Sequence, residues 1–411
     1  MIAWSLLLLC SVSIGVFSLK FTHLELVAKV VLELADINIL VSPAAIDFSL
    51  AQIYLGSGGE TEPALKEVLG TQGAKKKEVV KAFRQKYTEL KVFSRLYAIN
   101  GTPLCQCYRN LSRKSLNVDV EFLDKTVEGI SKINQWVSSK TKGKVAELID
   151  SPMFNDGTKI FMVNAVNFEG SWELPVQKTL PRKFYMPDQN RSVSVEMMEI
   201  PGQFKYNFQK TLDAHVALLP YRKSNLSMAL VVPKTFKGIR TVENKLRYLD
   251  LVNLSPKQIH VSLPKFKIKY DQDMAQALTD LGIKGIFNDT FLQSFTKPKE
   301  NTRLDILQGS TSLDVDEKGT KGSAGADGEM IPAPPVKKVP KNRSNLSKEN
   351  STSPQEVDKK ESNGSAGAVA RSESVEVLNR SELMITCNRP FLFAIVEGTR
   401  ILFFGRYSRP V

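Results

Sequence analysis

The stretch Val163-Asn164-Ala165-Val166-Asn167-Phe168-Glu169-Gly170-Ser171-Trp172 continues an apolar run that starts at Ile160. A run of this length, apolar on both sides, predicts a strand buried on both faces. Residues 228–232, 391–396 and 401–404 have the same character. The sequence therefore predicts a protein built around strands that lie inside it.

Patterns on either side of this stretch predict helices as well. Residues 39–41 (ILV) suit a short strand, and residues 45–55 are apolar enough for a buried helix. One helix face is indicated by the three- and four-residue spacing of Val127, Ile130, Ile133 and Val137. Helices and strands are scattered instead of alternating as βαβ units, which predicts an α+β fold.

The composition limits the class of function. Among 411 residues, 56 Lys and Arg stand against 43 Asp and Glu, and the net charge of +13 favours anionic partners. There are three histidines and no nucleophile-elbow, zinc-binding or phosphate-loop motif, so we expect no enzyme, no cofactor and no metal. Basic and aromatic residues do not interleave, so nucleic acid is not an expected partner.

The N-terminus has the features of a secretion signal. Residues 2–17 are apolar and uncharged, and Val16 and Ser18 are small enough for the positions before a signal-peptidase cut. The run is too short to span a membrane comfortably. We therefore expect residues 1–18 to be removed and residues 19–411 to reach the extracellular space; an N-terminal anchor is the alternative.

Cysteines and glycosylation sequons agree with a secreted protein whose fold rests on its core. The mature chain would keep Cys105, Cys107 and Cys387, which cannot form a disulfide framework, and a bridge between Cys105 and Cys107 would be strained. Acceptor sequences for N-glycosylation are frequent. The candidate sites are Asn100, Asn110, Asn190, Asn225, Asn288, Asn342, Asn345, Asn350, Asn363 and Asn379.

A set of short motifs in a fixed order makes the chain resemble a serpin over nearly all of its mature length. The segment from residue 319 to 378 interrupts the set, because it has almost no large apolar side chain and is expected to be mobile. The motifs are residues 38–43 (NILVSP), 54–61 (YLGSGGET), 133–137 (INQWV), 141–144 (TKGK), 163–172 (VNAVNFEGSW), 218–221 (LLPY), 263–266 (LPKF), 316–320 (DEKGT) and 388–393 (NRPFLF).

This resemblance implies one α+β domain with three β-sheets, about nine helices and an exposed reactive loop, here residues 319–387. In the family the loop is bait for a serine protease. After cleavage its first part inserts into the central sheet as a strand, and the acylated protease is trapped. The resemblance implies a monomer that inhibits a serine protease without a cofactor. A non-inhibitory binding, carrier or signalling protein with a cleavable, glycosylated loop is the alternative.

Insertion requires a hinge with small residues on alternate positions. Thr320 and its alternate neighbours would face inward, whereas Lys321 would face solvent. Lys265 is the expected ion-pair partner of the hinge glutamate. The hinge residues are Glu317, Gly319, Thr320, Gly322, Ala324 and Ala326.

Because the loop is so long, more than one position for the bond that a protease would cut is possible. Counted back from Asn388, the bond is Arg380-Ser381, with Arg371-Ser372 as the runner-up. Arginine suits the acidic pocket of a trypsin-like protease. Counted forward from Glu317, the cut falls near Ala333-Pro334.

Two further sites are indicated by comparison with the family. Ser42 and Asn134 remain of a polar cluster that controls opening of the sheet, whereas Ala45 and Gly309 stand where many serpins have serine and histidine. A basic helix could bind a glycosaminoglycan or another polyanion, although a solvated helix face is the alternative. Its residues are Lys75, Lys76, Lys77, Lys81 and Arg84.

Overall fold

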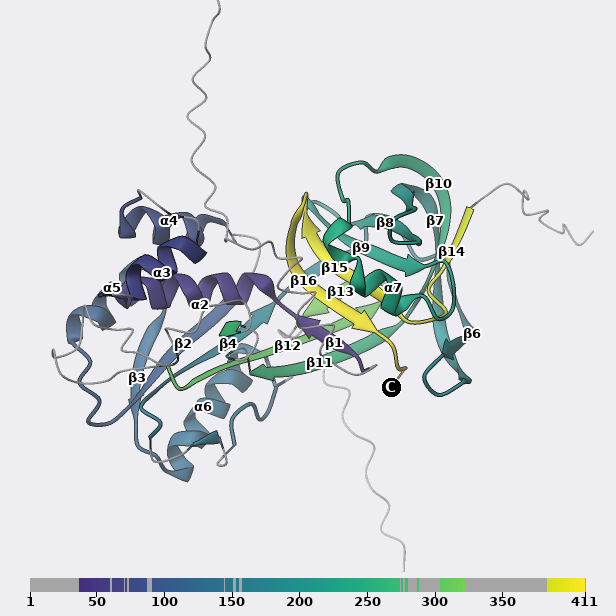
Figure 1. The fold of residues 1–411 in the computed structure, drawn as a ribbon. Coiled ribbons are helices and arrows are strands. Elements are labelled where there is room, and N and C mark those ends of the chain that lie inside the picture. Colours follow the sequence, from purple (N-terminus) through teal and green to yellow (C-terminus); the bar gives the residue numbers. More distant parts are fainter. Residues whose placement is uncertain are drawn as a thin grey trace, which may run out of the picture. The chain divides into compact units, whose positions relative to one another are not determined.

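The computed structural model describes residues 37–59, 61–69, 71, 74–86, 91–143, 145–150, 153–154, 157–273, 275, 278–279, 287, 304–322 and 383–410. Residues Met1–Ala326 and Glu382–Val411 make one compact unit. A second unit, Asp327–Ser381, lies outside the described residues. All elements named below belong to the first unit (Figure 1).

One sheet of the described part has seven strands, in the order β3-β2-β4-β12-β13-β5, with β11 also paired to β12. Along one side β12 pairs with β11; along the other it pairs first with β4 and then with β13. The strands are β2 (Lys91–Ile99), β3 (Asp119–Leu123), β4 (Ile160–Asn167), β5 (Glu169–Ser171), β11 (Phe266–Asp273), β12 (Ile306–Asp316) and β13 (Gly319–Gly322).

The other sheet has nine strands, in the order β1-β16-β15-β9-β8-β7-β10-β14, with β6 also paired to β7. Three sheets were expected, but the strands described form two. The long β7 joins β6, β10 and β8 in one sheet, because it pairs with β6 over residues 191–199, with β10 over residues 197–206 and with β8 over residues 205–209. The strands are β1 (Ile39–Val41), β6 (Lys178–Met186), β7 (Arg191–Gln209), β8 (Ala214–Pro220), β9 (Leu226–Pro233), β10 (Ser255–Pro264), β14 (Leu383–Thr386), β15 (Phe391–Glu397) and β16 (Arg400–Tyr407).

Helices accompany both sheets, so the α+β class is confirmed. Within the described ranges they are α2 (Pro43–Gly56), α3 (Thr61–Val68), α4 (Lys76–Lys86), α5 (Gln106–Leu116), α6 (Val127–Lys140) and α7 (Ile239–Asn244), followed by the 3-10 helix η2 (Leu246–Tyr248). None of the helices in this part of the chain is long and apolar enough to cross a membrane.

The buried helix predicted at residues 45–55 is confirmed as α2. Every residue of α2 is buried, and the helix contacts β2, β4 and β16. It begins where Ser42 accepts a hydrogen bond from the backbone N–H of Ala45, a normal N-cap that satisfies a free donor of the first turn. A largely apolar sequence suits this position between the sheets.

The buried strands were also predicted correctly, as β4, β9, β15 and β16. The helix at residues 127–137 is present as α6, and Ile133 and Val137 are buried. Val127 is 75% exposed, so its assignment to the buried face was wrong. It is the first residue of α6, and a side chain there has no preceding turn to cover it.

The C-terminal strands supply a large aromatic part of the core. Phe391, Phe393 and Tyr407 are buried and pack with Phe266 from β11. Gly405 leaves room for this packing, because a Cβ there would collide with the Phe393 ring. The C-terminal segment is therefore integral to the fold.

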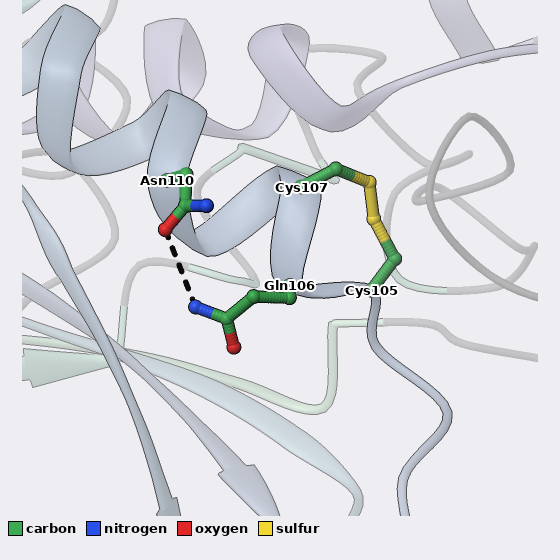
Figure 2. Close-up of a disulfide and its surroundings, with 4 residues drawn as sticks. All are labelled: Cys105, Gln106, Cys107 and Asn110. Carbon is green, nitrogen blue, oxygen red and sulfur yellow. Dashed lines mark hydrogen bonds between the residues drawn. A yellow bond between two sulfur atoms is a disulfide. The ribbon is translucent and has the colours of Figure 1, made fainter.

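Cys105 and Cys107 form a disulfide, the pairing that was expected from the sequence to be strained. Figure 2 shows their sulfur atoms joined at the start of α5. Cys105 is extended and immediately precedes the helix, whereas Cys107 lies in its first turn. This change of direction leaves the two Cα atoms 5.2 Å apart, within the usual disulfide range. Cys387 is a free thiol and is buried.

Candidate functional site

The residues after Glu317 form a strand between two others. After a turn at Glu317 and Lys318, β13 runs antiparallel to β12, with Gly319 opposite Asp316 and Gly322 opposite Leu313. On its other side β13 runs antiparallel to β5. The beginning of the expected hinge is therefore already hydrogen-bonded into the sheet.

Side chains alternate along β13 as a strand requires. Thr320 is fully buried, and its hydroxyl accepts a hydrogen bond of 2.8 Å from the hydroxyl of Tyr221. Burial raises the pKa of Tyr221, which keeps this donor protonated. Lys321 is partly exposed and pairs with Asp316 at 3.2 Å. Thr320 thus faces the interior and Lys321 faces solvent.

Aromatic rings support the buried side of β13. The ring of Trp172 stacks on that of Tyr221, with centroids 5.0 Å apart, and its indole N–H donates to the carbonyl of Asp316. Gly319 has a φ of +148°, and a Cβ there would collide with the carbonyl oxygen of Gly170. Only glycine allows the two backbones to approach so closely at this point.

The hinge glutamate forms an ion pair at the outer end of β12. Lys265 Nζ lies 3.0 Å from Glu317 Oε1, and the Thr179 hydroxyl donates to the same oxygen. A hydrogen bond from the backbone N–H of Glu317 lowers the pKa of this carboxyl, and the bonds from Lys265 and Thr179 act in the same direction. The carboxylate is therefore the form that the surroundings favour.

Replacing Glu317 with glutamine is expected to destabilise the protein by less than about 1 kcal/mol, because both partners of the pair are about 40% exposed. Since the folded state lowers the pKa of Glu317, this contribution is present above the ordinary glutamate pKa of about 4.3 and is lost as the pH falls through the lower folded value. Urea denaturation of E317Q and wild type at pH 7 and pH 3.5 measures it. A larger difference at pH 3.5 than at pH 7 would contradict the assignment.

The first half of β12, residues 306–311, pairs directly with β4, whereas its last residues, 313–316, pair with β13. The parallel register of β12 and β4 runs from Ile306 opposite Phe161 to Thr311 opposite Val166. A strand continuing beyond Gly322 would have to separate β4 from β12 along this seam. The β4–β12 seam is therefore the place where the sheet would open.

A polar residue of the seam was missed by the sequence interpretation. Asn164 on β4 is 3% exposed, and its amide donates to the Ser49 hydroxyl on α2 at 2.8 Å. Its register partner on β12 is Gly309, which offers no side chain. The signal was present, because an asparagine within a strand predicted to be buried on both faces needs a hydrogen-bonding partner inside the protein.

Ser42 and Asn134 are not brought together. The Ser42 hydroxyl donates to the carbonyl of Leu402 on β16. The amide of Asn134 on α6 instead donates to the carbonyl of Ile149 and accepts from the backbone of Leu148 and Ile149. Ser42 and Asn134 therefore do not form one cluster. The side chain of Asn134 forms hydrogen bonds with the backbone of a loop beside α6, and the asparagine at the seam is Asn164.

The basic residues on and before α4 divide into two kinds. Lys75, Lys77 and Lys81 are exposed. Lys76 turns toward the protein: its ammonium donates to the carbonyl of Ser57 and pairs with Glu62 at 2.8 Å. The side chain of Arg84 lies outside the described residues. Three of the five predicted basic residues are thus exposed to solvent.

Four of the candidate glycosylation sites can be located, and all four are exposed. They are Asn100, Asn110, Asn190 and Asn225. Asn110 lies on α5, where its side-chain oxygen accepts a hydrogen bond from Gln106 (Figure 2).

The remaining candidates from the sequence lie outside the described residues, as does the segment 1–18. They are the bond candidates Arg371, Ser372, Arg380 and Ser381, the hinge residues Ala324 and Ala326, and the glycosylation candidates Asn288, Asn342, Asn345, Asn350, Asn363 and Asn379.

Within the described ranges, no group of three or more His, Cys, Asp or Glu is arranged to hold a metal ion. The site consists of a strand, the sheet that receives it and the ion pair at its turn. A sheet of this kind can accept a further chain segment as a strand. Among the described residues of this site, no nucleophile is paired with a base.

Comparisons with known proteins agree with this geometry. The chain is 30% identical over 302 residues to serine protease inhibitor 42Dd of Drosophila melanogaster, covering 70% of this chain and 81% of that protein. It is 27% identical over 315 residues to serpin B6 of Macaca fascicularis, covering 72% and 84%.

Solved structures share the fold. The crystal structure of Serpin48 from the insect Tenebrio molitor matches with a TM-score of 0.75 at 22% identity, covering 97% of each chain. Cleaved Serpin 42Da matches with a TM-score of 0.73 at 21% identity. The family model described as Serpin (serine protease inhibitor) matches residues 18–410. The chain belongs to the serpin family, whose members are mostly inhibitors of serine proteases.

Proposed function

We propose that the protein inhibits serine endopeptidases by loop cleavage, strand insertion and covalent trapping. The observation that supports this most is β13, which already lies as a strand against β12 and β5 with Thr320 buried and Lys321 outward. Ala324 and Ala326 would continue the same alternation with small inward side chains.

Insertion would lengthen β13 along the β4–β12 seam. It would replace one parallel ladder with two antiparallel ladders, so the backbone groups of the inserted residues would pair within the sheet. This gain is the free energy that would pull the acylated protease away from the position at which hydrolysis finishes. The protein would therefore act once per molecule.

A non-inhibitory carrier or signalling protein is the second candidate. It is favoured by Gly309, which places no side chain opposite Asn164 where the sheet would open. It is favoured also by Pro332, Pro334 and Pro335, because prolines cannot donate to a β-ladder. In this case the loop would be cut without insertion.

A gel assay distinguishes the two candidates. The purified protein is incubated with trypsin and with chymotrypsin, then heated in SDS. The inhibitor proposal expects a heat-stable band with trypsin, at the mass of the two proteins less the released C-terminal peptide. Sequencing that peptide identifies Arg380-Ser381 or Arg371-Ser372 as the bond. Clean cleavage at every ratio, with no complex and no rise in thermal stability, would leave the second candidate.

We further propose that residues 1–18 direct secretion and are removed. Their apolar, uncharged sequence and the small residues Val16 and Ser18 support this. N-terminal sequencing of protein from the culture medium is expected to begin at residue 19. Protein that stays with the membrane fraction and keeps Met1 would favour the anchor instead.

Binding of a glycosaminoglycan to Lys75, Lys77 and Lys81 is a further proposal, because these lysines are exposed at one helix. The double variant Lys77→Glu, Lys81→Glu is expected to leave a heparin column at clearly lower salt than wild type. The control variant Lys223→Glu, Lys245→Glu changes the net charge equally at exposed positions elsewhere. Equal shifts for both variants would mean that only the overall charge matters.

A further inference from the structure

A hollow of about 430 Å³ lies away from the β4–β12 seam, at the end of the larger sheet where β6 meets β7. It is lined by residues of β6, of β7, of the segment after β9 and of the segment after β14: Lys183, Tyr185, Ser192, Phe236, Lys237 and Asn388. Its volume is within the range usual for sites that bind small molecules. We call it the Phe236 hollow.

Two aromatic rings form its apolar wall. Phe236 is 46% exposed, which is unusual for so large an apolar side chain. The ring of Tyr185 meets it edge-on, with centroids 5.5 Å apart and planes at 87°. An exposed ring beside a hollow leaves apolar surface that another planar group can cover.

The wall is held in place by neighbouring contacts. The guanidinium of Arg389 lies 4.8 Å from the centroid of Phe236, and it is fixed by hydrogen bonds to the carbonyl of Pro233 and the side chain of Asn388. The backbone N–H of Tyr185 donates to the carbonyl of Asn388. A ligand would therefore meet a preformed surface, at a low cost in ordering.

Two ammonium groups border the hollow without a partner. Lys183 and Lys237 are exposed, and neither has an ion pair or hydrogen bond among the interactions of the described residues. Together with Arg389 they give this end of the sheet a positive potential, which attracts an anion. Aromatic surface and free cations thus occur side by side.

We propose that the Phe236 hollow binds a small aromatic anion, a planar ring that carries a sulfonate, sulfate or carboxylate. The ring would lie against Phe236 and Tyr185, and the anionic group would be bound by Lys183 and Lys237 through charge-assisted hydrogen bonds. The described residues that line the hollow belong to the larger sheet and its connecting segments.

The probe is 8-anilinonaphthalene-1-sulfonate, followed by its fluorescence on titration with the full-length mature protein. Phe236→Ala and the double variant Lys183→Gln, Lys237→Gln are each expected to weaken binding by at least about tenfold, since each removes one half of the recognition. Tyr248→Ala is the matched control, because Tyr248 is 53% exposed and also carries a stacked arginine, Arg247, at 4.9 Å.

The uncharged analogue N-phenyl-1-naphthylamine tests the role of charge, and it is expected to bind at least about tenfold more weakly than the sulfonate. Circular dichroism verifies that each variant is folded; the lysine variant changes only exposed side chains. Wild-type affinity in both Phe236→Ala and the lysine variant would overturn the proposal. Equal binding of the uncharged analogue would overturn it as well.

Discussion

Thr320→Arg is expected to turn the inhibitor into a substrate, so that the loop is still cut but the SDS-stable complex disappears. Thr320 is fully buried in β13 and accepts a hydrogen bond from Tyr221, so a guanidinium there would keep the start of β13 out of the sheet instead of being buried without a carboxylate partner. Burying an unpaired charge costs several kcal/mol, and about 2.7 kcal/mol already corresponds to a hundredfold. Densitometry of complex against cleaved product after reaction with trypsin measures the effect.

Lys321→Arg is the matched control, because this side chain is the outward neighbour of Thr320 and pairs with Asp316 at the surface. It should trap the protease like wild type. If Thr320→Arg forms as much complex as Lys321→Arg, insertion does not begin at β13. A wild type that forms no complex would refute inhibition itself, whatever the variants do.

Glu243→Ala is expected to destabilise the folded protein by about 3–5 kcal/mol, the usual loss when one member of a buried ion pair is removed. Glu243 on α7 and Arg406 on β16 are both fully buried, with Arg406 Nη1 2.6 Å from Glu243 Oε1. Without the carboxylate, the buried guanidinium of Arg406 would lose its ion pair with Glu243. The midpoint of urea denaturation, followed by tryptophan fluorescence, measures the loss.

Lys267→Ala is the control for this experiment. Lys267 pairs with Asp314 at 3.1 Å, but its side chain is 81% exposed, so its removal is expected to cost less than about 1 kcal/mol. Similar losses in both variants would mean that burial of the Glu243–Arg406 pair does not determine its contribution.

Much of the fold follows from the sequence because its elements depend on local patterns. The apolar runs of β4, β15 and β16, and the largely apolar helix α2, could be predicted from periodicity and length alone. The same reasoning failed at Val127, because the end of a helix is covered or exposed according to what lies beyond it. Element types are therefore more predictable than the burial of single side chains.

The contacts of the site could not be predicted in the same way. Tyr221 and Thr320 are 99 residues apart, and their hydrogen bond depends on where β13 enters the sheet. Asn134 and Asn164 are equally plausible as sequence positions; only the register of β4 with β12 places Asn164 at the seam. The bridge between Cys105 and Cys107 likewise depends on the change of direction at the start of α5.

The position of the last two strands has a practical consequence for anyone who handles this protein. Any break between β13 and β14 would leave β14, β15 and β16 on a separate polypeptide. That polypeptide would remain bound, because β15 lies between β9 and β16, β16 lies between β15 and β1, and the aromatic side chains of both strands are buried in the core. The nicked two-chain molecule would elute from a sizing column with the intact one and separate from its fragment only in denaturant. An unchanged elution volume is therefore no sign that the loop is whole.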